Sequence, residues 1–159
     1  MTYVKKNLES ILSLWISFVF IQSLFFKFTN SPETQYIFST LDSWAAGFGF
    51  SGLFLPPGPF NQYIVGSAEL IASLLLLAGI FSAIKFRAFG ASVALVVISG
   101  AIFFHLFTPL GVEVAGPGFE ADGGALFIMA VTVWLSSAYL ILKNKAYLPI
   151  LGKMTNTAD

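Results

Sequence analysis

Residues 62–84 read QYIVGSAELIASLLLLAGIFSAI, a stretch in which Glu69 is the only acidic or basic side chain. An α-helix rises 1.5 Å per residue, so about 20 such residues cross the ~30 Å hydrocarbon core of a bilayer. Backbone groups in lipid must find hydrogen-bond partners within their own segment, and this favours a helix over an extended chain. The stretch therefore predicts a membrane-spanning helix with one charged group inside it.

Three further apolar stretches have about the same length, and they occupy residues 8–28, 88–108 and 122–142. We therefore expect an all-α membrane protein whose four transmembrane helices form an antiparallel bundle, with residues 1–159 as a single domain. The composition agrees, because 57% of the residues are apolar and 10% are charged, against roughly 45–50% and about 25% in soluble proteins. The absence of cysteine excludes thiol relays and cysteine-ligated clusters. The chain also lacks the basic patch that would indicate nucleic-acid binding.

The basic residues are distributed unevenly between the two sides of the predicted bundle. Seven of the eight fall on one side: Lys5, Lys6, Lys85, Arg87, Lys143, Lys145 and Lys153. Basic residues stay in the cytoplasm when a membrane protein inserts, so this side and both chain termini are expected there. We predict a multi-pass protein of the bacterial cytoplasmic membrane.

The connection between the first two spans, residues 31–60, is long and aromatic. Ser31 can cap a helix that has Pro32 at its first position. Four apolar residues then recur at helical spacing, as in an amphipathic helix at the membrane interface: Ile37, Leu41, Trp44 and Phe48. Residues 47–60, GFGFSGLFLPPGPF, contain too much glycine and proline for a regular helix. We expect them to cover the outer end of the bundle or to enter the headgroup layer.

The ionisable residues of the spans gather in the outer half of the predicted bundle, one from each helix. They are Lys27, Glu69, His105 and Asp122, and Gln22 and Gln62 extend the same polar region. Ionisable groups inside membrane spans are costly to bury, and they commonly mark a functional site. The inner half shows no comparable group. We therefore predict a polar pocket just beneath the outer surface, formed by these six residues.

A structural interpretation of each residue competes with this prediction. Lys27 can extend to the interface without any further role, and Asp122 can stabilise the first turn of the fourth helix. His105 can be a hydrogen-bonded structural residue, whereas Glu69 is the hardest to explain in this way. Imidazole and carboxylate groups could also hold a metal ion, but the chain has no metal-ligand motif and we predict no metal site.

Three short motifs resemble the DoxX and DoxX-like membrane proteins: FFKF at residues 25–28, GSAELIASLLLLAG at 66–79 and GAIFFHLF at 100–107. The resemblance covers most of the chain outside residues 30–60, and it extends to the nicotinic-receptor chaperone NACHO. It implies a four-helix membrane bundle. It also places the helix-one lysine of the family at Lys27, its helix-two glutamate at Glu69 and the histidine of its FFH element at His105.

The resemblance implies less about function, since relatives are associated with quinone-linked sulfur oxidation, oxidative-stress assemblies and membrane-protein assembly. Our first hypothesis is an accessory protein whose pocket binds a quinone or another small amphipathic ligand. Glu69 and His105 would then bind the polar head while Lys27 balances the charge. The chain has no evident electron carrier, so a role as an oxidoreductase component would need a partner. The alternative is a non-enzymatic assembly factor or a subunit of a membrane complex, and homo-oligomers are compatible with either. The sequence leaves open whether there is a reaction at all.

Overall fold

The computed structural model describes residues 2–148, with side chains from residue 7 onward. Lys153 and the side chains of Lys5 and Lys6 lie outside this description. The α-helices are α1 (Thr2–Phe28), α2 (Pro32–Ala46), α3 (Gly66–Phe81), α4 (Ile84–Phe107) and α5 (Ala125–Asn144). A π-helical segment, η1 (Pro59–Val65), leads into α3, and a short 3-10 helix, η2 (Lys145–Tyr147), follows α5. No strand occurs within residues 2–148.

Four segments are long and apolar enough to cross a membrane: Asn7–Phe28, Pro59–Phe81, Ile84–Phe107 and Ala125–Tyr147. The expected all-α membrane fold is therefore confirmed. The second span begins earlier than the sequence suggested, because η1 continues into α3 without a break. The fourth span begins later, because Gly123 and Gly124 adopt positive φ angles of 58° and 82° that end the preceding turn, a conformation that favours glycine.

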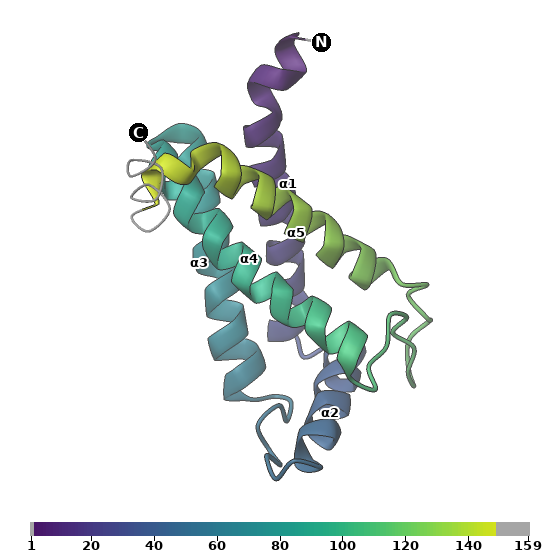
Figure 1. The fold of residues 1–159 in the computed structure, drawn as a ribbon. Coiled ribbons are helices and arrows are strands. Elements are labelled where there is room, and N and C mark those ends of the chain that lie inside the picture. The colour runs from purple at the N-terminus through teal and green to yellow at the C-terminus, as the bar shows by residue number, and fades with distance from the viewer. Residues whose placement is uncertain (1, 149–159) are drawn as a thin grey trace.

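The four spanning helices form the bundle, and α2 covers one end of it (Figure 1). We call this the cap end. The opposite end carries the start of α1, the turn between α3 and α4, and the end of α5, and we call it the terminal end. Helix α3 contacts both α1 and α4, and α5 contacts α4 and α1. The axes of α3 and α4 diverge from their tight turn toward the cap end (Figure 1).

Two glycines explain why α3 and α4 touch at the terminal end. A Cβ atom added at Gly79 would lie 2.6 Å from the Cβ of Arg87, and one at Gly90 would lie 2.9 Å from the backbone nitrogen of Leu76. Both separations are shorter than van der Waals contact, so larger side chains would force the helices apart. Small residues at such crossings allow close backbone approach.

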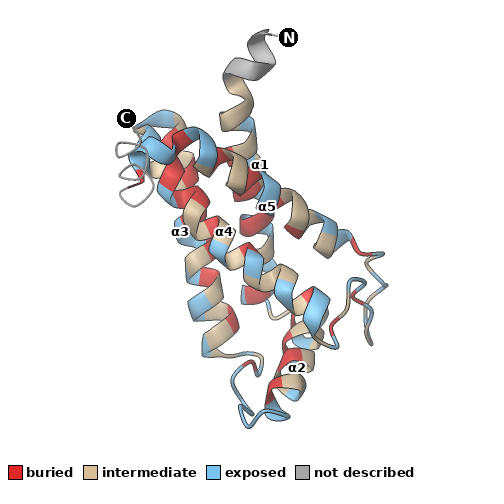
Figure 2. Cartoon of the chain, in the orientation of Figure 1, coloured by how far each residue is buried: buried red, intermediate tan, exposed pale blue. Residues whose placement is uncertain are grey.

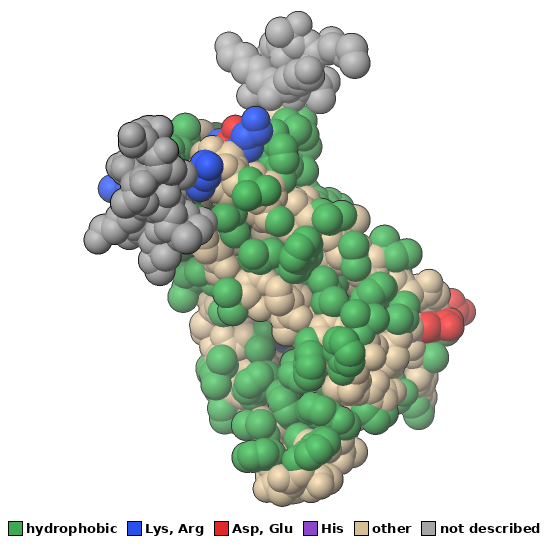
Figure 3. Space-filling view, viewed as in Figure 1, with side chains coloured by type: hydrophobic (Ala, Val, Ile, Leu, Met, Phe, Trp, Pro, Cys, Tyr) green, Lys and Arg blue, Asp and Glu red, His purple; other side chains and the backbone are tan. Residues whose placement is uncertain are grey.

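The buried residues of the bundle lie along the facing sides of its helices, and the outward sides are exposed (Figure 2). The core contains Ile16, Phe20, Ala72, Leu76, Ala91, Ala94, Val133 and Leu140, with smaller contributions from their neighbours. Many large apolar side chains remain on the outside, and hydrophobic side chains are spread over the whole of the visible face that is described (Figure 3). Phe25 is 69% exposed and Phe81 84%. A soluble protein rarely exposes such an extensive apolar surface, whereas lipid would cover it.

A second apolar cluster, the cap core, lies between α2 and the two connections at the cap end. It consists of Phe38, Leu41, Ala45, Phe54, Leu110 and Val114. Ser31 caps α2 and Pro32 occupies its first turn, as predicted. Of the predicted apolar face, Leu41 is buried, Ile37 and Trp44 are partly buried against the cap core, and Phe48 lies beyond the helix end and is exposed. The buried side of α2 therefore overlaps the predicted face and extends to Phe38 and Ala45. In the segment from 47 to 60, Phe54 points inward.

Candidate functional site

The most deeply placed charges at the cap end form one ion pair. The Lys27 ammonium donates to both carboxylate oxygens of Glu69, each at 3.0 Å. Ser23 donates to the same carboxylate at 3.3 Å and accepts a short hydrogen bond from Lys27. The Lys27 and Glu69 side chains are 10% and 7% exposed. The pair therefore joins the last turns of α1 to the first turn of α3, largely out of contact with the surroundings.

Local sequence explains why these groups meet. Ser23 and Lys27 are four residues apart, so they lie on the same side of α1. Gly66 faces Leu24, whose Cδ2 atom would lie only 3.3 Å from an added Cβ, and this close approach brings α1 to the start of α3. Gln62 donates its side-chain amide to the backbone oxygen of Lys27 at 3.1 Å. This bond fixes the end of α1 against η1.

His105 and Asp122 form a separate arrangement at the same end of the molecule. The His105 Nδ1–H donates to the backbone oxygen of Gly111 at 2.7 Å, and its ring packs edge-on against Phe127. Among the described residues, no hydrogen bond or ion pair joins either His105 or Asp122 to the Lys27–Glu69 pair. The structure thus distributes the four predicted residues between two places rather than in one chamber.

Asp122 organises the connection between α4 and α5. Its carboxylate accepts backbone N–H bonds from Val114 at 2.7 Å, Gly124 at 3.0 Å and Leu126 at 2.9 Å. Partial burial alone would raise the pKa of Asp122, but the three N–H donors, together with the nearby His105 imidazole, hold that pKa below its ordinary value. Asp122 lies before α5 rather than in its first turn. Its carboxylate still binds the Leu126 N–H in that turn, which agrees with the interpretation of Asp122 as a structural residue that stabilises the start of the helix.

Gln22 and Gln62 differ in their placement. Gln62 lies beside the ion pair through its bond to Lys27, whereas the Gln22 side chain is exposed on the outer surface of α1. The structure therefore does not bring Gln22 to the pair. Within the described part of the chain, no three His, Asp or Glu side chains come close enough to hold a metal ion.

A polar network at the terminal end corrects the expectation that this half has none. The Arg87 guanidinium donates to Glu9 at 2.8 Å and to the backbone oxygen of Gly79 at 3.2 Å. Asn144 donates to the same Glu9 oxygen at 3.0 Å. The sequence places Arg87 only among the basic residues of the cytoplasmic side, but α4 begins at Ile84 and buries it. The missed signal is that Glu9, Arg87 and Asn144 lie at matching depths of three different spans.

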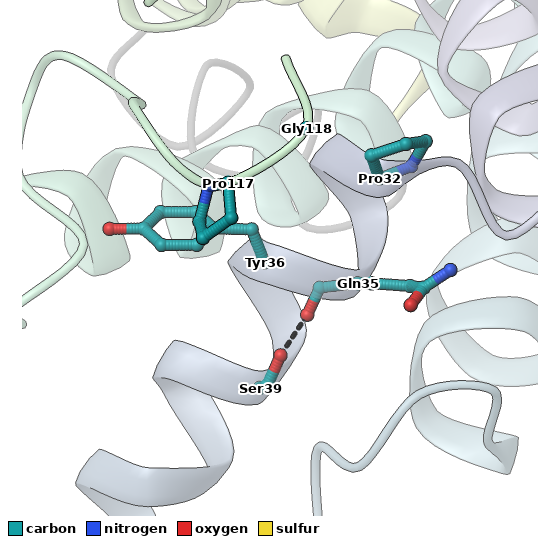
Figure 4. Close-up of a pocket in the computed structure, with 6 residues that line it drawn as sticks. All are labelled: Pro32, Gln35, Tyr36, Ser39, Pro117 and Gly118. Atoms are coloured by element: carbon teal, nitrogen blue, oxygen red, sulfur yellow. Dashed lines mark hydrogen bonds between the residues drawn. The ribbon is translucent and has the colours of Figure 1, made fainter.

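One open depression lies on the surface of the cap end, between α2 and the connection that precedes α5. Pro32, Gln35, Tyr36 and Ser39 of α2 line one side, and Pro117 and Gly118 line the other. Pro117 lies over the Tyr36 ring, and Ser39 bonds back to the carbonyl of Gln35 (Figure 4). No charged side chain takes part in this depression, and it is separate from the ion pair.

Fold and buried charges together define a small integral membrane protein with four spans and an ion pair beneath a helical cap. The DoxX family model matches residues 10–106, which is more than half of the chain. The chain therefore belongs to the DoxX family. The matched range contains Lys27, Glu69, Arg87 and His105, while Asp122 and α5 lie beyond it. No curated protein and no solved structure gives a significant match.

Proposed function

We propose that the chain is a membrane accessory protein that binds the polar head of a small amphipathic ligand, of the quinone class, beside the Lys27–Glu69 pair. The observation that carries the proposal is the burial of these two charges at the cap end. Burying an ion pair costs desolvation free energy, and apolar residues of similar volume commonly stabilise a protein as well or better. A pair retained inside a membrane span is therefore a candidate for function.

The donors and acceptors of the pair suit a quinone head. Lys27 and Ser23 can donate hydrogen bonds to a quinone carbonyl, and Glu69 can accept one from a hydroquinone hydroxyl. In the present arrangement these groups satisfy one another. A ligand would exchange one of these bonds for its own, without leaving a buried charge unpaired. His105 is not part of this proposed head site, because no hydrogen bond or ion pair among the described residues joins it to Lys27 or Glu69.

The ligand tail would enter along the exposed apolar sides of α3 and α4 near the cap end. The tail would lie among the apolar side chains on the lipid-facing side of these helices, where Leu70, Phe103 and Phe107 are exposed. An amphipathic ligand could then reach the pair laterally from the bilayer. This route would keep its head from crossing the cap core.

The distribution of charge supports an orientation with the cap end outside the cytoplasm. Lys85, Lys143 and Lys145 are exposed at the terminal end, as the positive-inside rule requires for a cytoplasmic surface. Both chain termini would then be cytoplasmic in a bacterial membrane. Because the chain has no evident electron carrier, a redox reaction would proceed on a partner protein, with this chain supplying the bound ligand.

Equilibrium binding of a short-chain quinone to the protein in lipid nanodiscs tests the proposal. The neutral pair Lys27→Met with Glu69→Gln removes both charges together, so it should fold while binding the quinone at least tenfold more weakly. Glu9→Gln alters the carboxylate of the other network and serves as the matched control, with unchanged binding. Equal binding by the wild type and the neutral pair would reject the ligand site. A stoichiometric protein partner, recovered without any bound ligand, would favour the assembly-factor alternative.

A further inference from the structure

Residues 47–55, which we call the cap loop, carry large apolar side chains on their surface. Phe48 is 67% exposed, Phe50 62% and Leu55 57%. The chain has no acidic or basic residue from position 43 to position 68, so the cap loop and the residues on either side of it carry no charge. Figure 3 shows hydrophobic side chains at this end of the molecule, where Figure 1 places the connection between α2 and α3. Water is an unfavourable surrounding for such a surface.

The structure of the cap loop holds these side chains in place. The Phe50 N–H donates to the backbone oxygen of Ala45 at 3.1 Å. The Phe54 N–H donates to the Asp42 carboxylate at 3.0 Å, and the Phe54 ring is buried in the cap core. The cap loop is therefore fixed to α2 and to the cap core, and its exposed side chains are those that the core leaves outside.

Aromatic contacts connect the cap loop to the exposed side of α4. The centroid of the Trp44 six-membered-ring system lies 5.2 Å from that of the Phe48 ring and 6.5 Å from that of the Phe103 ring. Phe103 in turn contacts Phe107, with 5.3 Å between the two ring centroids. Phe103 and Phe107 are both exposed near the end of a segment that is long and apolar enough to cross a membrane. The aromatic surface thus continues from the lipid-facing side of α4 through Trp44 to the cap loop.

The opposite flank of α2 is polar. Successive residues of an α-helix are rotated by about 100°, so Trp44 lies about 180° around α2 from Gln35. Gln35 and Ser39 are exposed and line the open depression of the cap end. Glu113 and Glu120 are exposed in the connection that forms the other side of this depression. Helix α2 therefore separates a polar, acidic side of the cap from an apolar side, as an element at a membrane surface does.

We propose that the cap loop inserts into the bilayer leaflet on the cap side, with its exposed phenylalanine and leucine side chains at the boundary between headgroups and acyl chains. Interfacial elements bury their apolar side about 5–10 Å into this boundary. The cap loop is irregular, and its unpaired backbone groups need water, which the headgroup layer supplies and the hydrocarbon core does not. Continuity with the lipid-facing side of α4 favours lipid over a protein as the partner of this surface. The insertion requires neither the ion pair nor a ligand, so it is independent of the proposed function.

Lipids that carry a nitroxide quencher test the insertion. The chain has no cysteine of its own, so a single introduced cysteine can carry a fluorophore at a chosen position. Phe50→Cys and Leu55→Cys place the fluorophore on the cap loop, and Ser39→Cys places it on the polar flank of α2 as the matched control. All three positions are exposed, so labelling should leave the fold intact. In vesicles of phosphatidylcholine and phosphatidylglycerol, the nitroxide lipids should quench both cap-loop fluorophores strongly and the control weakly.

Comparing nitroxides near the headgroup with nitroxides near the chain end gives the depth of each fluorophore. Phe50→Cys should lie about 5–10 Å below the headgroups, and Val96→Cys should lie deeper, because Val96 is 74% exposed near the middle of α4. Water-soluble iodide should quench the Ser39→Cys control and leave the cap loop unaffected. Iodide quenching of the cap loop equal to that of the control would place the loop in water and overturn the proposal. Protection from both iodide and the nitroxide lipids would show that a protein surface covers the cap loop, and it would overturn the proposal equally.

Discussion

Lys27 Nζ lies 3.0 Å from each of the two carboxylate oxygens of Glu69, and this double contact joins the end of α1 to the start of α3. Both side chains are at least nine-tenths buried. The charges of the pair are satisfied by each other and by Ser23. Its integrity should therefore affect both stability and any ligand chemistry.

Removing one partner of this pair should be much more harmful than removing both. Lys27→Met leaves the Glu69 carboxylate without a counter-charge, and it should lower the free energy of unfolding by about 3–5 kcal/mol. The neutral combination of Lys27→Met with Glu69→Gln should recover most of that loss. Denaturant titrations of the two single variants and the combination form a double-mutant cycle. Additive losses would show that the two residues do not interact.

The close approach of α3 and α4 should depend on Gly79. An added Cβ would lie 2.5 Å from the backbone nitrogen of Arg87, so Gly79→Ala should destabilise the protein by about 1–3 kcal/mol through overpacking. Gly100 in α4 has no neighbouring atom within 4 Å of its added Cβ. Gly100→Ala is therefore the matched control, and it should be neutral or stabilising by up to about 1 kcal/mol. Thermal unfolding in detergent compares the two variants. An equal change in stability for both would argue against the close approach of α3 and α4 at Gly79.

The contribution of Arg87 to stability should depend on the shape of its guanidinium group and not merely on its positive charge. It binds Glu9 with one terminal nitrogen and the Gly79 carbonyl with the other, a forked geometry that an ammonium group cannot reproduce. Arg87→Lys should therefore lower the free energy of unfolding by about 1.5–3 kcal/mol, the loss of one hydrogen bond that involves a charged group. Lys85→Arg, at an exposed position of the same helix turn, should have no effect. A fully stable Arg87→Lys variant would contradict the two-pronged contact.

Asp122 should make the connection before α5 sensitive to acid. Its pKa in the folded protein lies below the ordinary value because three backbone N–H groups outweigh the effect of burial. Such a carboxylate stabilises the fold above the ordinary pKa of about 3.9, and the contribution is lost as the pH falls through the folded pKa.

Hydrogen exchange at the amides of Val114, Gly124 and Leu126 measures this effect. These amides should lose protection below about pH 4 in the wild type. Asp122→Ala should reduce their protection at neutral pH by about 1 kcal/mol, as for a lost helix cap, and should flatten the acid dependence. Unchanged protection in the variant would show that the carboxylate does not hold these amides.

Much of the fold could be predicted because membrane spans are encoded in a simple pattern. Apolar length indicates the spans, and Ser31 followed by Pro32 indicates the start of α2. The residue pattern also indicates that Glu69 points inward, since Gly66 and Ser73 lie on the same side of the helix and are likewise buried. These features depend on local periodicity, which the sequence contains directly.

The site could be predicted only in part, because periodicity gives the depth and face of a side chain but not the angle between helices. Lys27 and Glu69 meet because Gly66 lets α1 approach α3, whereas His105 lies on a helix that diverges from α3. The burial of Arg87 and its ion pair with Glu9 could not be predicted for a similar reason. The turn before it is only two residues long, so α4 begins earlier and brings the guanidinium inside the bundle.

Photoaffinity labelling tests the proposed ligand site most directly. A short-chain quinone carrying a photoreactive group would be irradiated with the protein in nanodiscs, and the labelled peptides would be identified by mass spectrometry. The account predicts labelling concentrated in the last turns of α1 and the first turns of α3, reduced by excess unlabelled quinone and by the combination of Lys27→Met with Glu69→Gln. Labelling spread over all lipid-facing helices, and unaffected by that combination, would contradict it.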